Sequence, residues 1–113
     1  MTFETYQGDD DLLNLAIIDD AGAAIDITNY TIRLTVKKPL TSTVLFTKVS
    51  TDTNQIAKTA PYSGGLAVVK ILSADTISLL GAYDFDVQLT LPSGLIKTFA
   101  KGVLKVIGDV SAP

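Results

Sequence analysis

The chain contains no histidine and no cysteine. Without histidine it lacks the side chain that most often acts as a general base near neutral pH, and without cysteine it has no thiolate nucleophile. The same absences exclude zinc fingers, haem and iron–sulfur ligation by these residues, and disulfide-stapled scaffolds. The sequence therefore predicts a protein that is not an enzyme, with no catalytic residues, no cofactor and no metal site.

Positive charge is also scarce, because nine Lys and Arg residues stand against twelve Asp and Glu residues and give a net charge of −3. Nucleic-acid binding needs a clustered basic face, and attraction to an anionic membrane surface needs a polybasic segment. No stretch approaches the about 18 apolar residues of a membrane span, and residues 1–8 lack the charge and apolar run of a secretory signal. We expect no nucleic-acid partner and no membrane partner.

The length and the hydrophobic content are sufficient for one folded domain. The chain has 113 residues, of which 47% are hydrophobic, and domains commonly contain roughly 100–150 residues. We expect a single domain over residues 1–113, with its core in about residues 5–108 and a frayed tail at 109–113.

Apolar and polar residues alternate along most of the chain, which is typical of half-buried strands. The alternation is most regular over residues 83–91, where Phe85 is expected at the centre of the core. Short strands separated by turns every roughly 8–12 residues favour an all-β, antiparallel, immunoglobulin-like β-sandwich of seven or eight strands. Other extended segments are expected at 12–18, 25–27, 30–37, 43–49, 55–58, 66–72, 95–99 and 103–107.

The period changes over residues 73–80, where we expect one short helical turn with Ser73 as its N-cap and Gly81 as its C-cap. The following residues, Leu79-Leu-Gly-Ala-Tyr83, resemble a tyrosine corner, in which a tyrosine hydroxyl bonds to the backbone just upstream of its own strand.

Two further details concern individual strands. Val44 and Phe46 are expected on one face of their strand, with Leu45 on the other. Gly102 is expected to mark a β-bulge between the last two extended segments.

Several polar residues were weighed as sites, and each is better explained structurally. The run Asp9-Asp10-Asp11 offers hard-cation ligands, but it lacks the calcium-loop pattern and suits a solvated loop; Asp19-Asp20 suits a turn. Asp84 and Asp86 share one strand face, as hydrolytic carboxylates would, but solubilising charge is the simpler interpretation. The remaining candidates are a Lys70–Ser73 dyad, a phosphate loop at Gly64-Gly65, and the pair Lys37-Lys38, and none has a supporting motif.

A binding role through aromatic residues remains as the alternative. Tyr6, Tyr30 and Tyr62 fall in or near expected loops, and exposed tyrosines could stack on sugars. A carbohydrate-binding or host-surface-binding β-sandwich is therefore the second hypothesis.

The order of the segments carries a resemblance. The segments that carry it are Gly8-Asp-Asp-Asp-Leu-Leu-Asn-Leu15, Asp19-Asp-Ala-Gly22, Ile25-Asp-Ile-Thr-Asn-Tyr-Thr-Ile-Arg-Leu-Thr-Val36, Val44-Leu-Phe-Thr-Lys48, Ser73-Ala-Asp-Thr76, Leu80-Gly-Ala-Tyr-Asp-Phe-Asp-Val-Gln-Leu89 and Gly102-Val-Leu-Lys-Val-Ile107. Over about residues 5–109 this layout resembles the N-terminal domain of phage baseplate upper proteins and related immunoglobulin-like tail proteins.

The resemblance implies a non-enzymatic virion component, made in the bacterial host cytoplasm, that docks onto other tail or baseplate subunits and that could also self-associate. Members of that family usually continue into a coiled coil and a distal domain, whereas this sequence stops at Pro113. The expectation is therefore an adaptor or decoration subunit. No functional residues are transferred, because the shared pattern is structural.

Overall fold

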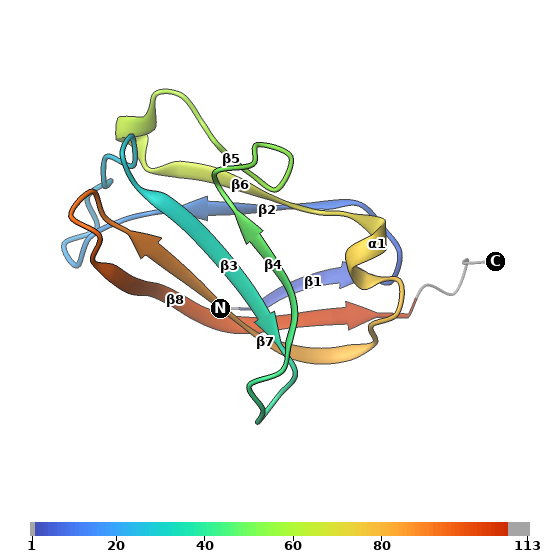
Figure 1. Cartoon of the computed structure of the whole chain (residues 1–113). Helices are drawn as coiled ribbons and strands as arrows, with labels where there is room; N and C mark the ends of the chain where they lie inside the picture. The colour runs from blue at the N-terminus through green and yellow to red at the C-terminus, as the bar shows by residue number, and fades with distance from the viewer. Residues whose placement is uncertain (1, 109–113) are drawn as a thin grey trace.

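The computed structural model describes residues 2–108 and contains eight strands in two sheets (Figure 1). The expected tail at 109–113 lies outside these described residues. The strands are β1 (Thr2–Tyr6), β2 (Asp11–Ala16), β3 (Thr31–Lys37), β4 (Val44–Val49), β5 (Ile56–Lys58), β6 (Leu66–Ile71), β7 (Gly81–Thr90) and β8 (Ile96–Ile107). A 3-10 turn, η1 (Tyr62–Gly64), precedes β6, and a short helix, α1 (Ser73–Thr76), follows it.

The strand order confirms the predicted immunoglobulin-like sandwich. One sheet has the order β1-β8-β7-β3-β4 and the other has the order β2-β6-β5. In constant-type immunoglobulin domains, strands B, E and D lie in one sheet and C, F and G in the other. Here β2, β6 and β5 take the first set of positions, and β3, β7 and β8 take the second, with β4 beside β3.

Strand β1 is the feature that the sequence did not predict. It pairs in parallel with β8, from Thr2 opposite Val103 to Tyr6 opposite Ile107, whereas the other named pairs are antiparallel. The segment was missed because its inward residues, Phe3 and Thr5, do not form an obvious apolar alternation. Because β1 pairs with β8, the first strand of the chain belongs to the five-stranded sheet and does not lie beside β2 in the other sheet.

The core lies between the two sheets and follows from the alternation of the strands. Phe85, predicted at its centre, is 3% exposed, and its outward neighbours on β7 are more accessible. The buried apolar side chains are Leu13, Leu15, Ile17, Ile27, Ile32, Leu34, Val36, Ile56, Ala67, Val69, Ile71, Phe85, Val87, Leu89, Leu104 and Val106.

Two expectations are wrong: that Val44 and Phe46 share one face of their strand, and that Gly102 marks a bulge. The register of β3 with β4 passes from Val36–Phe46 to Lys37–Val44, so a bulge at Leu45 puts Val44 and Phe46 on different faces. Strand β8 has its bulge at Phe99 and not at Gly102, because its register with β7 passes from Val87–Ala100 to Gln88–Thr98.

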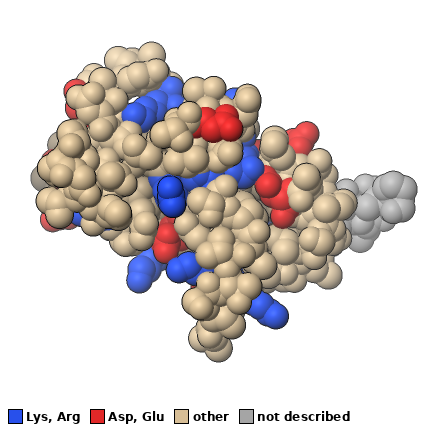
Figure 2. Space-filling view, viewed as in Figure 1, with Lys and Arg blue, Asp and Glu red and all other residues tan. Residues whose placement is uncertain are grey.

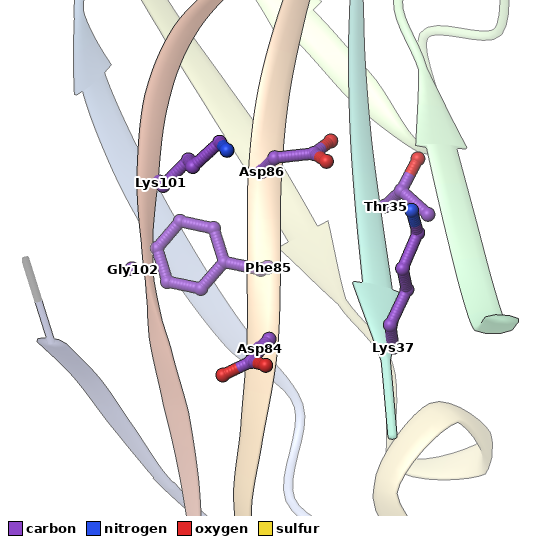
Figure 3. Close-up of a pocket in the computed structure, with 7 residues that line it drawn as sticks. All are labelled: Thr35, Lys37, Asp84, Phe85, Asp86, Lys101 and Gly102. Carbon is purple, nitrogen blue, oxygen red and sulfur yellow. The ribbon is translucent and has the colours of Figure 1, made fainter. Parts of the chain in front are cut away.

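Gly102 pairs in regular register with Phe85, and the Phe85 ring lies toward Gly102 (Figure 3). The glycine therefore makes room for a core ring and does not mark a bulge. Because there is no break at this position, the two expected segments at 95–99 and 103–107 form one long strand, β8. The expected piece at 25–27 is not a strand; the nearest pairing is an isolated bridge between Ile18 and Ala24.

The tyrosine corner is confirmed. The Tyr83 hydroxyl donates to the Leu80 carbonyl oxygen at 2.9 Å and accepts from the Leu80 N–H at 2.9 Å. These two bonds fix the chain where it enters β7, immediately after the connection from the other sheet.

The caps of α1 differ from those predicted. Leu72, not Ser73, occupies the N-cap position, and its N–H donates to the Asp75 carboxylate at 2.7 Å. The helix ends at Thr76, and Gly81, with φ of 106°, begins β7. Asp75 within the helix accepts from Leu72, and Asp10 from the β1–β2 loop accepts from the Ser73 N–H, so the Ser73 side chain does not act as the cap.

Candidate functional site

A depression on the outer face of the five-stranded sheet contains Asp84 and Asp86, the two carboxylates considered above for hydrolysis. It has a volume of about 280 Å³ and is lined by side chains of β3, β7 and β8 (Figure 3). Because Val36 and Phe85 point into the core, their neighbours in sequence point outward and form this surface. The polar lining residues are Thr35, Lys37, Asp84, Asp86 and Lys101.

The two carboxylates in this depression do not converge. Asp86 pairs across the sheet with Thr35 on one side and with Lys101 on the other, while Asp84 pairs with Lys37. In Figure 3 the Asp86 carboxylate points toward β3 and the Asp84 carboxylate points away from it. Hydrolytic carboxylate pairs flank one reacting bond; this arrangement instead places two acids among two lysines on an open sheet.

The acidic run at Asp9–Asp11 serves to hold a loop. The Ser73 N–H donates to Asp10 Oδ1 at 2.7 Å, and the Leu12 N–H donates to Asp11 Oδ1 at 2.8 Å. Among residues 2–108, no group of three or more acidic side chains is placed to hold a metal ion. The Ser73 N–H is thus bonded to the β1–β2 loop. The structure gives no hydrogen bond between Ser73 and Lys70, the two residues considered as a dyad.

Residues 72–80 connect β6 in one sheet to β7 in the other. Further hydrogen bonds join this connection to the loop between β1 and β2. The Gly8 N–H donates to Thr76 Oγ1 at 3.0 Å, and Thr76 is fully buried. Gln7 Nε2 donates to the Ile77 carbonyl oxygen at 3.0 Å. A Cβ atom at Gly8 would lie 2.9 Å from Ile77 Cδ1, so glycine permits this close approach.

Asp19 and Asp20 lie in a turn at the other end of the sandwich. Asp19 Oδ1 accepts from the N–H groups of Ala21 and Ala23, at 2.9 and 3.0 Å, as turn-forming aspartates do. Both residues line an open depression of about 420 Å³ that also includes Lys97 and Phe99.

The three tyrosines weighed for sugar binding do not form one platform. Tyr6 ends β1, beside α1, whereas Tyr62 lies in η1 at the opposite end (Figure 1). Tyr30 is partly buried against the core. The Tyr62 ring lies below the Lys58 ammonium, whose Nζ atom is 5.9 Å from the ring centroid.

Two charged residues near Tyr62 have shifted pKa values. The side chain and the backbone N–H of Thr28 donate to Asp26 and lower the pKa of its carboxyl. Partial burial lowers the pKa of Lys58, whose ammonium donates to the Thr28 carbonyl oxygen at 3.3 Å. Asp26 and Lys58 therefore both form hydrogen bonds to Thr28, in the loop before β3, and these bonds give each charged side chain a structural role.

The remaining candidates also have structural positions. Gly65 has a φ of 69°, and a Cβ there would lie 2.5 Å from the Ile17 carbonyl oxygen, so this glycine packs against the backbone. Lys37 and Lys38 end β3, with Lys37 on the sheet face and Lys38 at the start of the next loop. On the face in Figure 2, basic and acidic side chains are interspersed and form no field of one sign.

The buried ion pair between Lys48 and Asp75 was not found from the sequence. Lys48 Nζ lies 2.6 Å from Asp75 Oδ2, and the two side chains are 6% and 17% exposed. Lys48 Nζ also lies 5.8 Å from the centroid of the Phe46 ring. The two-residue period puts Phe46 and Lys48 on one face of β4, but the pairing with Val36 and Leu34 of β3, which makes that face the inward one, is not visible in the sequence.

Within residues 2–108 the structure has no helix long and apolar enough to cross a membrane. A scan against models of protein families finds no match for this chain, and a search of curated proteins finds no similar sequence.

Proposed function

We propose that this chain is a non-enzymatic assembly module of a phage or prophage tail or baseplate, which acts by contacts with other virion proteins. The observation that carries the proposal is a set of exposed apolar side chains around α1. Leu72, Ile77 and Leu80 are 44%, 62% and 60% exposed, and we call these three residues the α1 patch. Three exposed apolar side chains within the nine residues 72–80 favour a protein contact at this segment.

The α1 patch lies on a well-fastened segment. Its backbone is tied to the β1–β2 loop through Asp10 and Thr76, and to β4 through the Lys48–Asp75 ion pair. Tyr83 fixes the segment where β7 begins. A surface that is already ordered loses little conformational entropy when a partner binds, which suits a subunit that docks during assembly.

The assignment to a tail or baseplate rests on the resemblance of the strand and turn layout to baseplate upper proteins. The immunoglobulin-like sandwich is compatible with that assignment, but the same fold serves many functions. The exposed α1 patch supports the proposal because a subunit that docks onto other proteins needs an accessible apolar surface.

The test measures whether the chain enters particles. A tagged chain is expressed during induction of the phage, and particles are purified by density gradient and analysed by mass spectrometry. The proposal predicts that the chain co-purifies with tail proteins; its restriction to the soluble fraction would refute the proposal.

A matched pair of variants tests the patch itself. The double variant Ile77→Ser/Leu80→Ser should lower incorporation at least about tenfold, because it removes two side chains from the contact. Leu95→Ser is the control, since Leu95 is 61% exposed and lies in the β7–β8 turn at the opposite end of the sandwich (Figure 1). Equal incorporation of both variants would show that the α1 patch is not the contact.

A further inference from the structure

Strand β2 has a free edge. Within residues 2–108, the only strand beside β2 in the sheet order β2-β6-β5 is β6. The Ile17 N–H donates to the Gly65 carbonyl oxygen at 2.7 Å and continues the β2–β6 register. The backbone N–H and C=O groups of successive residues point to opposite sides of a strand. Because the Ile17 N–H points to the β6 side, the odd-numbered residues of β2 face β6 and the even-numbered residues face away from it. The outward residues are Asn14, Ala16, Ile18 and Leu12, of which Leu12 already donates its N–H to Asp11 Oδ1.

The other strands at sheet edges are less suited to accept a partner. Strand β5 has three residues, β4 carries the bulge at Leu45, and β1, at the edge beside β8, has five residues with the charged side chain of Glu4 exposed at its middle. Short and bulged edges are common protections against further pairing. In constant-type sandwiches the position beside strand B is filled by strand A, but here β1 lies in the other sheet. The architecture therefore has room for a strand beside β2.

The outer side chains along this edge form a strip that is apolar except for Asn14 in β2 and Lys70, which lies opposite Leu12 in β6. Leu12 and Ile18 are 56% and 45% exposed, and Ala16 between them is also exposed. On the adjacent strand, Leu66 lies opposite Ala16 and is 47% exposed, and Val68 lies opposite Asn14. A strand added to β2 would extend this apolar surface.

Acidic residues stand at both ends of the strip and disfavour a second copy of the chain. Antiparallel pairing of two β2 edges with residue 12 opposite residue 18 would place Asp11 opposite Asp19 and Asp10 opposite Asp20. In-register parallel pairing would place each aspartate beside its own counterpart. Like charges directly opposite in a sheet are destabilising, so the edge is protected from self-pairing.

We propose that the free edge of β2 binds, by strand addition, an extended segment of another protein that carries Lys or Arg at both ends of about seven residues. The seven residues match 12–18, a span of roughly 23 Å at about 3.3 Å per residue. Main-chain hydrogen bonds would hold the segment, small apolar side chains would continue the outer strip, and the basic ends would meet Asp9–Asp11 and Asp19–Asp20. The inference rests on the proposed function, because it names the partner segment of an assembly module.

The direct test uses synthetic peptides as probes. The first peptide has seven alternating threonine and valine residues between two pairs of lysines, and the second has glutamates in place of the lysines. Fluorescence anisotropy at low salt should show at least about tenfold tighter binding of the lysine-flanked peptide, with the difference shrinking as salt is added. Amide chemical shifts of the isotope-labelled protein should change at Asn14, Ala16 and Ile18.

Two variants test the edge and its charges separately. Asn14→Pro removes an outward N–H and leaves the bonds to β6, so it should weaken binding more than about tenfold, whereas Asn14→Thr should bind like the wild type. Asp9→Lys/Asp20→Lys reverses charge at two side chains for which the structure records no hydrogen bond. It lowers the charge of the two ends from −3 and −2 to −1 and 0, so most of the preference for the lysine-flanked peptide should disappear even if Asn14→Pro fails to fold.

Several results would overturn the inference. These are equal binding of the two peptides, no binding of either, unchanged binding by a folded Asn14→Pro variant, or shifts that map away from β2. A dimer in light scattering that Asn14→Pro abolishes would identify a second copy as the occupant and would also overturn it. None of these results would affect incorporation of the chain into particles, so the failure of this inference is distinguishable from the failure of the proposed function.

Discussion

The Lys48–Asp75 ion pair gives a stability prediction that depends on one contact. Asp75→Asn keeps an oxygen that can accept from the Leu72 N–H, but it removes the negative charge that lies 2.6 Å from Lys48 Nζ. Lys48 is then a buried ammonium whose ion-pair partner is gone. Breaking a buried pair in this way costs about 3–5 kcal/mol, and we expect the lower end because the Asp75 side chain is 17% exposed.

A loss of about 3 kcal/mol is a large part of a total stability of about 5–15 kcal/mol. For a domain of this size it corresponds to a fall in Tm of roughly 12 °C, at about 4 °C per kcal/mol. Lys48→Met should cost less, about 1 kcal/mol, because the remaining carboxylate can reach water and the methionine can pack beside Phe46.

Urea unfolding of the wild type, the two single variants and the double variant completes a double-mutant cycle. The double variant should lose at least about 1 kcal/mol less than the sum of the single losses, because the second substitution removes the charge that the first left without its partner. A Tm of Asp75→Asn within about 2 °C of the wild type, or additive losses within about 0.5 kcal/mol, would refute the reasoning.

Four further substitutions test the packing and the backbone, with free energies of unfolding measured in urea. Phe85→Ala should cost about 3–5 kcal/mol because it empties the centre of the core, and a near-wild-type stability would contradict that placement. Tyr83→Phe removes both hydroxyl bonds to Leu80 and should cost about 1–2 kcal/mol; no loss would mean that the tyrosine corner contributes nothing. Gly65→Ala should cost more than about 2 kcal/mol, because φ is 69° and the new Cβ would lie 2.5 Å from a carbonyl oxygen, and a neutral result would show that the loop relaxes. Thr5→Val should be neutral or stabilise by up to about 1 kcal/mol, because Thr5 Oγ1 is buried without a hydrogen-bond partner; a clear loss would reveal a partner for this hydroxyl.

Alternation and turn chemistry were sufficient to predict the sandwich. The regular pattern of β7 placed Phe85 correctly in the core, and the spacing from Leu79 to Tyr83 identified the tyrosine corner before any coordinates. Both signals are local, because one follows from the two-residue period of a strand and the other from a tyrosine a few residues after the backbone that it bonds.

The errors concern long-range relations. The parallel pairing of β1 depends on β8, about 100 residues away in the chain, and nothing near Phe3 and Thr5 announces it. The bulge at Leu45 follows from the pairing of β4 with β3, so the face of Val44 could not be read from β4 alone. The cap of α1 was misplaced because Asp10, in a distant loop, accepts from Ser73.

The candidate polar residues illustrate the same limit. Composition and spacing could suggest that Asp84 and Asp86 share a face, and they do, but only the structure shows that their carboxylates point apart (Figure 3). The free edge of β2 is a property of the sheet order and has no signature within residues 11–16. The aspartates on either side of it were visible in the sequence, but their relation to an edge was not.

The measurement that tests the central claim most directly is the position of the chain on an assembled particle. Purified particles carrying the tagged chain are labelled with gold-conjugated antibody against the tag and viewed by negative-stain electron microscopy, with untagged particles as the control. The account predicts gold at the tail or baseplate. Label no more frequent than on untagged particles, or label confined to the capsid, would contradict it.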